Sequence, residues 1–441
     1  MVFFSILSPM NELAKELNEI LKDSVAYPFL SERGKRMYFP KGIVAQSAEA
    51  GEKAKRYNAT VGLAKDKGEP FCLSDIYDEF SSGNLSKSDI FSYAPGGGDK
   101  ALRALWQKEM IRKNPSLSGK LFSDTLVTGG LTHTISMIAE MFLDKGDEIV
   151  CPDLYWDNYQ LIFEDLIGGK LRHFRFFTNE GRFNVEGMKE ALLASPGDTA
   201  RIILNFPNNP TGYTPSKARA KEIVKALKEV AETKKVMVIS DDAYFGLFFE
   251  DETEKESLFA HLVDAHENIF AIKGDAATKE EMVWGFRIGF ITYGSKGLGK
   301  EHLDALVKKT LGAIRCTVSN CDRPGQSLLL NAMRNGQRYS SDKQYLFDVV
   351  SRRYKILIDA LAEHGSSAYL KPYPFNSGYF MAFDTLGNDA EQLRVHLLEK
   401  YQIGTINILG KTLRLAYCSV EEENLKDLVD ILYKAAEEIW S

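Results

Sequence analysis

The sequence predicts an α/β protein in which a mostly parallel sheet is covered by helices on both faces. Short apolar runs, such as 201–204, 236–239 and 268–272, alternate with segments of helical periodicity. Each run gives way to polar residues or glycine, as expected where a buried strand leaves its sheet. With 441 residues the chain is also too long for one simple core, so two domains are expected.

An amphipathic helix is expected near the N-terminus, over 11–22, where leucines and an isoleucine recur at helical spacing. A hairpin or loop follows over 57–70, and within it Gly62 would allow the backbone to approach a ligand closely. A second glycine-rich loop, 92–98, precedes an amphipathic helix that starts at Asp99. This loop lacks the Lys-Ser/Thr pair of a P-loop, so we do not interpret it as a nucleotide site.

Strands and helices alternate from about residue 121. A short strand at 126–127 leads into the glycine turn 128–133, which opens a helix running to about Phe142. A start of this kind directs free backbone N–H groups and the positive end of a helix dipole toward an anion. The turn is therefore a candidate anion site.

Polar and aromatic residues follow the later strands. One strand leads into an aromatic loop around Trp156, a second (201–204) into the segment 208–212, and a third (236–239) into Asp241. The carboxyl ends of the strands in a doubly wound sheet share one edge, and ligands lie along it. These loops are therefore expected to converge.

Lys279 lies between two apolar runs, 268–272 and 288–293, that are interpreted as buried strands. A lysine in that place is expected at the ligand-binding edge of the sheet rather than on the surface. Arg287 follows eight positions later. We interpret Lys279 as the amine that forms a Schiff base with an aldehyde cofactor, and Arg287 as the residue that holds the phosphate of that cofactor.

The pattern changes after about residue 325. A long helix over roughly 342–364 precedes an apolar strand at 378–383. A helix, the strand 412–417 and a terminal amphipathic helix follow. This order predicts a smaller α+β domain.

Four motifs support a more specific interpretation. They are Asn-Asn-Pro-Thr-Gly at 208–212, Asp-Asp-Ala-Tyr-Phe-Gly at 241–246, the lysine-to-arginine segment 279–289, and Leu-Arg-Leu at 413–415. In this order, and across most of the chain, they resemble the pyridoxal-phosphate-dependent aminotransferases of class I/II, in the aspartate aminotransferase superfamily of fold type I.

The resemblance implies a particular division of the chain. A large cofactor-binding domain over 71–325 would hold a mostly parallel, seven-stranded sheet between helices. Residues 326–441 would form the smaller C-terminal α+β domain. The N-terminal segment 1–70 would contribute to that small domain and to a dimer arm.

The resemblance also implies roles around the ring of pyridoxal 5'-phosphate. Lys279 would form the Schiff base and then carry a proton between the substrate Cα and the cofactor. Asp241 would pair with the pyridine nitrogen and keep it protonated, which makes the ring an electron sink. Tyr244 and Asn209 would hydrogen-bond to the phenolic oxygen, and Trp156 would stack on the ring face.

The cofactor's phosphate and the substrate would be bound by residues from other loops. Arg287 would bind the phosphate together with backbone and hydroxyl groups of the turn, and Tyr93 would reach it from the other subunit of an obligatory homodimer. Arg414 would bind the substrate's α-carboxylate, with Gly62 and Asn209 beside it. The turn residues are Gly130, Leu131 and Thr132.

The sequence departs from the family pattern around the lysine. Ala276 stands where a serine or glycine is usual, so a hydroxyl contact to the phosphate is missing, and whether Thr278 replaces it is left open. A histidine that often supports the pyridine-binding aspartate would fall near Tyr159. The segment 280–282, Glu-Glu-Met, is also unusual. These departures bear on the substrate more than on the cofactor.

The function predicted on these grounds is ping-pong transfer of an amino group from an L-amino acid, aspartate or aromatic or similar, to a 2-oxo acid. The alternative is another activity of the same fold type, such as a β-lyase or a decarboxylase. A sensor domain of a transcription regulator has little support, because no basic helix-turn-helix segment precedes the catalytic part.

Composition narrows the possible partners and the compartment. A net charge of −6 without a basic block argues against nucleic acid or an anionic membrane as a partner. The five cysteines contain no C-x-x-C pair, which favours reduced thiols in a cytoplasmic protein and no metal site. The apolar start of the chain is too short for a signal peptide, and no run is long enough to cross a bilayer.

Overall fold

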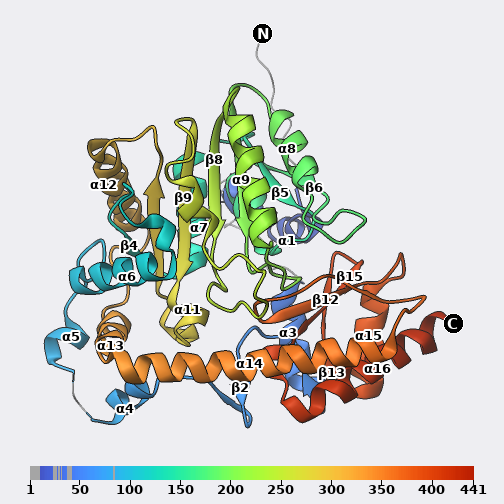
Figure 1. The fold of residues 1–441 in the computed structure, drawn as a ribbon. Coiled ribbons are helices and arrows are strands. Elements are labelled where there is room, and N and C mark those ends of the chain that lie inside the picture. Colours follow the sequence, from blue (N-terminus) through green and yellow to red (C-terminus); the bar gives the residue numbers. More distant parts are fainter. Residues whose placement is uncertain (1–9, 23–26, 28–29, 31, 37–41, 83–84) are drawn as a thin grey trace.

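The computed structural model describes residues 10–22, 27, 30, 32–36, 42–82 and 85–441. Its main sheet has seven strands in the order β4-β10-β9-β8-β7-β5-β6 (Figure 1). Only β10 runs antiparallel to its neighbours, which confirms the predicted, mostly parallel sheet. The strands are β4 (Leu126–Thr128), β5 (Glu148–Pro152), β6 (Lys170–Phe174), β7 (Thr199–Asn205), β8 (Lys235–Asp241), β9 (Ile269–Ala276) and β10 (Gly289–Gly294).

Both faces of this sheet are buried because side chains alternate along its central strands. Ile202 and Val238 belong to one hydrophobic core, and their neighbours Ile203 and Ile239 belong to the other. The first core is completed by helices α8 (Val185–Leu193), α9 (Lys217–Ala231) and α10 (Leu258–Leu262). Helices α7 (Leu131–Phe142) and α12 (Lys300–Thr317) contribute to the second.

A second, four-stranded sheet has the order β11-β12-β15-β14 and is antiparallel throughout. Figure 1 shows it at the lower right with helices α15 (Ala390–Tyr401) and α16 (Leu425–Trp440). The long helix α14 (Gly336–His364) runs below the main sheet to this smaller unit. The strands are β11 (Lys371–Pro372), β12 (Phe380–Asp384), β14 (Ile406–Ile408) and β15 (Thr412–Ala416).

The N-terminal part of the chain contacts the C-terminal part. Helix α3 (Ile43–Lys53) packs on β13 (Ile403–Gly404) and β14, and β1 (Tyr57–Asn58) pairs in parallel with β13. The expected hairpin within 57–70 forms from β2 (Lys65–Asp66) and β3 (Glu69–Pro70). The residue boundaries of the predicted domains stay a prediction.

The remaining helices surround these sheets. They are α1 (Glu12–Leu21), α2 (Glu32–Arg36), α4 (Ser74–Ser82), α5 (Lys87–Phe91), α6 (Lys100–Lys113), α11 (Ala277–Glu280) and α13 (Arg323–Arg334). Helix α1 confirms the amphipathic helix predicted over 11–22, and Asn11 caps it by accepting a hydrogen bond from Leu13 N at 2.9 Å. Within the described ranges, none of the helices combines the length and apolarity needed to span a bilayer. The apolar start of the chain lies outside the described residues.

Candidate active site

The candidate site lies where three neighbouring strands of the main sheet end. β7 ends at Asn205, β8 at Asp241 and β9 at Ala276, and the single turn of α11 that follows β9 carries Lys279. One pocket brings these ends together with the predicted turn, aromatic loop and arginine. Its lining residues are Leu131, Thr132, Trp156, Asn205, Asn209, Asp241, Ala243, Tyr244, Thr278, Lys279 and Arg287.

Asp241 is the buried acid of this pocket, with only 2% of its surface exposed. The phenol of Tyr159 donates a short hydrogen bond to Oδ2, while Ala243 N at 3.1 Å and Asn205 Nδ2 at 3.2 Å donate to Oδ1. Burial raises the pKa of Asp241 to about 6, although the hydrogen bonds from Tyr159 and Ala243 act in the opposite direction. The carboxylate is therefore oriented and still available to a protonated ring nitrogen.

Lys279 lies close to Tyr244, with its Nζ 4.9 Å from the centre of the phenol ring. Burial lowers the pKa of Lys279 to about 8, the carboxylate of Asp241 opposes this effect, and Arg287 adds to it. An amine with this pKa is partly neutral near pH 7, and the neutral form is the nucleophile.

The pKa of Lys279 predicts a pH dependence in the cofactor-free protein. The rate at which added pyridoxal phosphate becomes covalently attached is expected to rise toward about pH 8 and then level off, because only the neutral amine attacks an aldehyde. Stopped-flow absorbance at constant ionic strength measures this rate. A rate that still climbs steeply between roughly pH 9 and 10, as for an ordinary lysine, would contradict the prediction.

The turn that opens α7 forms a cradle for an anion. Gly130 has a φ of 87°, and a Cβ at this position would lie 2.6 Å from Nη2 of Arg287, so the glycine lets the guanidinium approach. Arg287 donates to the carbonyl of Trp284 at 3.1 Å and, within the described part of the chain, makes no ion pair with a carboxylate. Thr278 Oγ1 is buried in the same pocket without a hydrogen-bond partner among the described residues. The hydroxyl of Thr278 without a described partner, the guanidinium of Arg287 without a described ion pair and the N-terminus of α7 together fit a phosphate.

Arg414 approaches the pocket from β15 of the smaller sheet and is almost fully buried. Its Nη1 donates to Asn209 Oδ1 at 3.0 Å, its Nη2 donates to Thr60 O at 2.7 Å, and its guanidinium lies 4.3 Å over the ring of Phe380. Its Nε has no hydrogen-bond partner among the residues that the structure describes. The structure thus brings Arg414 to Asn209 with one donor still available.

Gly62 lies in contact with the same group of residues. A Cβ at this position would lie 2.7 Å from the Phe380 ring and 3.4 Å from Tyr244 Oη, so a side chain would push the loop away. The carbonyl of Gly62 accepts a hydrogen bond from the indole of Trp284 at 3.0 Å, which fixes the loop. Gly62 is therefore closely packed against protein side chains, and its predicted approach to a ligand stays a prediction.

Of the two aromatic residues predicted for the cofactor site, one lines the pocket and the other does not. Trp156 is half-buried, lines the pocket, and lies edge-on to Tyr159 with ring centres 5.6 Å apart. Tyr93 is 89% exposed and does not line this pocket within the single chain. Its predicted contact belongs to a partner subunit and stays a prediction.

The two glutamates that follow Lys279 point away from the pocket. Glu280 Oε1 accepts from Lys113 at 2.7 Å and from Lys343 at 3.1 Å, and Glu281 Oε1 accepts from Lys343 at 2.8 Å. These ion pairs tie the turn that carries Lys279 to α6 and α14. They account for the acidic pair, which departs from the family pattern in the sequence.

Sequence reasoning missed two groups of supporting residues. Asn205 bonds to Asp241 through its amide and also accepts from Asn209 N at 2.7 Å; its place at the end of an apolar strand is the signal that could have found it. Lys273, buried in β9, pairs with Asp242 at 2.6 Å and with Asp275 at 2.8 Å. Its signal is a lysine inside an apolar run that is followed by an acid two residues on.

The fold and the site together define the class of pyridoxal-phosphate-dependent enzymes with an α/β sheet, because a sheet-edge lysine, a buried acid and a phosphate cradle meet in one pocket. The family model described as aminotransferase class I and II matches residues 62–432. The chain belongs to this family of transaminases, whose members use pyridoxal phosphate.

Individual relatives agree with this assignment. The chain is 27% identical over 364 residues to a probable aspartate/prephenate aminotransferase of Aquifex aeolicus, a match that covers 79% of this chain and 84% of the relative. An aminotransferase crystal structure from Anaerococcus prevotii is 28% identical, with a TM-score of 0.81 over 90% of this chain and 97% of that one. Aspartate aminotransferase from Thermus thermophilus with maleate, 22% identical, shares the fold with a TM-score of 0.72 over 92% of this chain and 99% of that one.

Proposed function

We propose that this aminotransferase moves an amino group from an L-amino acid to a 2-oxo acid by a ping-pong reaction, in which the first product leaves before the second substrate binds. The observation that carries the proposal is the pocket that Lys279 and Asp241 line together, with Arg414 hydrogen-bonded to Asn209 in its lining. Bound pyridoxal phosphate would supply an aldehyde carbon that exchanges amines and a ring that withdraws electrons. All other parts of the reaction fall to residues of this chain.

The residues that would hold the cofactor are those of the pocket. Arg287, Thr278 and the turn at Gly130–Thr132 would bind the phosphate, and Asp241 would hold the proton on the pyridine nitrogen. Tyr244 and Asn209 would hydrogen-bond to the phenolic oxygen. Trp156 would cover one face of the ring.

Lys279 would bond covalently to the cofactor and, once displaced by the substrate, would move the proton at the substrate Cα. A general base works best when its pKa lies near the working pH, and the pKa of Lys279, at about 8, meets that condition. The neighbouring phenol of Tyr244 and the carboxylate of Asp241 keep the amine inside the pocket.

Arg414 would bind the α-carboxylate that amino acids and 2-oxo acids share. Because the guanidinium is buried, its charge-assisted bonds to a carboxylate are stronger than they would be in water. Substrates of the aspartate or the aromatic type are proposed. The aspartate type agrees with the name of the aspartate/prephenate aminotransferase to which the chain is similar. An aspartate substrate also needs a second cation for its side-chain carboxylate, and the described residues that line the pocket include only Lys279 and Arg287 as cations.

A half-reaction screen tests this proposal. Each standard amino acid is added alone to the cofactor-loaded protein, and the absorbance of the cofactor and the release of ammonia are followed. Stable conversion of the cofactor without ammonia, reversed by a 2-oxo acid, is the expected result. Continuous ammonia or carbon dioxide release without an acceptor would instead indicate a β-lyase or a decarboxylase.

We also propose a cytoplasmic homodimer in which Tyr93 of each subunit reaches the phosphate of the other. The exposure of this tyrosine in the single chain supports the proposal. Light scattering gives the oligomeric state. Tyr93→Phe is expected to weaken retention of pyridoxal phosphate, because one hydrogen bond to the phosphate is lost.

Replacing Arg414 by glutamine is expected to raise the KM for the amino acid by roughly 100-fold, because a charge-assisted contact to its α-carboxylate is lost. The KM for the 2-oxo acid should rise in parallel, since both substrates carry the same carboxylate. Steady-state kinetics measures both constants. Arg352→Gln, which removes an exposed arginine paired with Glu422, is the matched control and should leave both unchanged. A rise confined to one substrate would contradict the role.

A further inference from the structure

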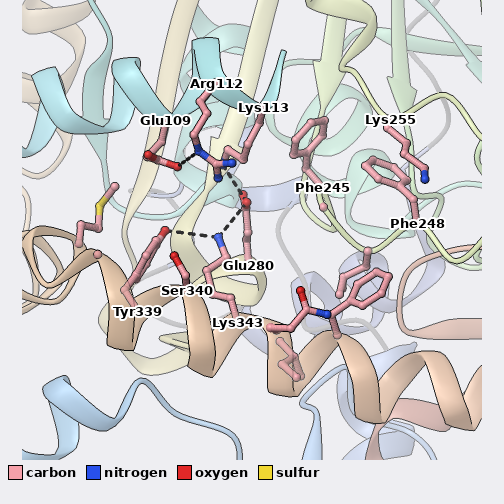
Figure 2. A pocket seen from close by; sticks show the side chains of 17 residues that line it. Glu109, Arg112, Lys113, Phe245, Phe248, Lys255, Glu280, Tyr339, Ser340 and Lys343 are labelled. Carbon is pink, nitrogen blue, oxygen red and sulfur yellow. Dashed lines mark hydrogen bonds and ion pairs between the residues drawn. The ribbon is translucent and has the colours of Figure 1, made fainter. Parts of the chain in front are cut away.

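A second pocket, of about 600 Å³, lies on the other side of the turn that carries Lys279. It opens between the end of α6, the loop 245–248 that follows β8, and the first half of α14. Figure 2 shows Glu280 and Lys343 in its wall, with Phe245 and Phe248 beside them. This pocket and the candidate active site have no lining residue in common.

The lining of this second pocket combines apolar and charged side chains. Aromatic and aliphatic side chains reach it from three elements, and its volume falls within the range of about 300–1,000 Å³ that small-molecule sites occupy. The apolar lining residues are Phe245, Leu247, Phe248, Met333, Leu346 and Phe347. A ligand with an apolar body of about two rings would therefore find surface to bury.

The charged residues of the pocket favour an anion. Its cationic lining residues are Arg112, Lys113, Lys255 and Lys343, whereas Glu109 and Glu280 are its carboxylates. Glu281, which does not line the pocket, also pairs with Lys343. Counting it, the four cations exceed the three carboxylates by one charge. Lys255 also lies 3.5 Å from Asp251, but that carboxylate is fully exposed, so the pair is screened by solvent.

Two of these cations have donors to offer. Arg112 uses its Nε for Glu109 at 2.8 Å, and its terminal nitrogens have no hydrogen-bond partner among the described residues. Lys255 makes no hydrogen bond to a described side chain and is half exposed. Lys113 and Lys343 already donate hydrogen bonds to Glu280, so they differ from Arg112 and Lys255.

We propose that this pocket is a second ligand site, separate from the active site, for a small organic anion with an aromatic or similarly apolar body. The apolar side chains contact the body. Arg112 and Lys255 lie on opposite sides of the pocket in Figure 2, so either one alone binds the carboxylate or sulfonate group. Its wall includes Glu280, the residue next to Lys279, so the ligand would lie directly behind the turn that carries Lys279.

Fluorescence titration with 8-anilino-1-naphthalenesulfonate, an apolar anion, tests the proposal on the cofactor-loaded protein. One saturable site per chain is expected. The double variant Arg112→Gln/Lys255→Gln should bind the probe about tenfold more weakly, because the charged contact to the sulfonate is lost on whichever side it forms. The uncharged analogue N-phenyl-1-naphthylamine should bind the variant and the wild type equally.

Controls separate this site from the active site and from a general loss of positive charge. Arg414→Gln should leave probe binding unchanged, and so should Lys296→Gln/Lys300→Gln, which removes two exposed lysines elsewhere. Ser340→Trp, on the exposed side of α14, should fill the pocket and abolish binding of both probes. Absence of saturable binding, loss of binding in Arg414→Gln, or an unchanged affinity in Arg112→Gln/Lys255→Gln would each overturn the proposal.

Discussion

Replacing Lys279 by alanine is expected to lower the transamination rate by roughly 10⁴-fold and to abolish covalent attachment of the cofactor. Two functions would be lost together, because in the proposed mechanism the same amine bonds to the cofactor and moves the proton at the substrate Cα. Borohydride reduction followed by peptide mapping should find pyridoxyl label on the Lys279 peptide in the wild type. No labelled peptide should be found in the variant.

The choice of control matters because a second buried lysine lies six residues upstream. Lys273 is held between Asp242 and Asp275, and these carboxylates raise its pKa, so it stays protonated and does not attack an aldehyde. The matched control is therefore the exposed Lys296→Ala, which should keep full activity and full labelling. Label recovered on the Lys273 peptide in either protein would mean that the wrong lysine has been assigned.

Much of the fold follows from local patterns. Strands β7, β8 and β9 are apolar runs of the length expected for buried strands, and each ends near a polar residue, so their existence and common edge could be predicted. The ends of elements were less predictable. Helix α14 begins at Gly336 rather than near 342. This start could not be predicted from the sequence, because no capping side chain marks it.

The candidate site divides in a similar way. Residues that stand in motifs, such as Asp241 and Arg287, could be chosen from the sequence because the chemistry needs those side chains at strand ends. Their supporting contacts could not, because they join residues far apart in the chain. Tyr159 bonds to Asp241 across 82 positions, and Lys343 bonds to Glu281 across 62. Nothing in local periodicity encodes such pairs.

The fold explains the acidic pair after Lys279, which the sequence alone shows only as a departure from the family pattern. In sequence, Glu280 and Glu281 stand beside a cationic site. In the structure they face α6 and α14, where Lys113 and Lys343 compensate their burial. Met282 then adopts a φ of 55°, a conformation that is costly for a residue other than glycine and is held by its surroundings.

Replacing Asp241 by asparagine is expected to lower kcat by roughly 100- to 1,000-fold while leaving cofactor attachment to Lys279 intact. Asparagine preserves the shape of the side chain but carries no negative charge, so the group proposed to keep the pyridine nitrogen protonated would be lost. The phosphate cradle and Lys279 are untouched, and borohydride labelling of the Lys279 peptide should still succeed. Kinetics and labelling on the same preparation therefore distinguish a charge effect from a failure to bind cofactor.

Tyr159→Phe is the matched control for this charge effect. It removes the hydrogen bond to Asp241 Oδ2 but leaves the carboxylate charge and the donors from Ala243 and Asn205 in place, so a loss of less than about tenfold is expected. A cofactor methylated on its pyridine nitrogen carries the positive charge permanently and should restore part of the activity of Asp241→Asn. If Tyr159→Phe is as defective as Asp241→Asn, or if the methylated cofactor gives no gain, orientation of the ring rather than charge is what Asp241 contributes.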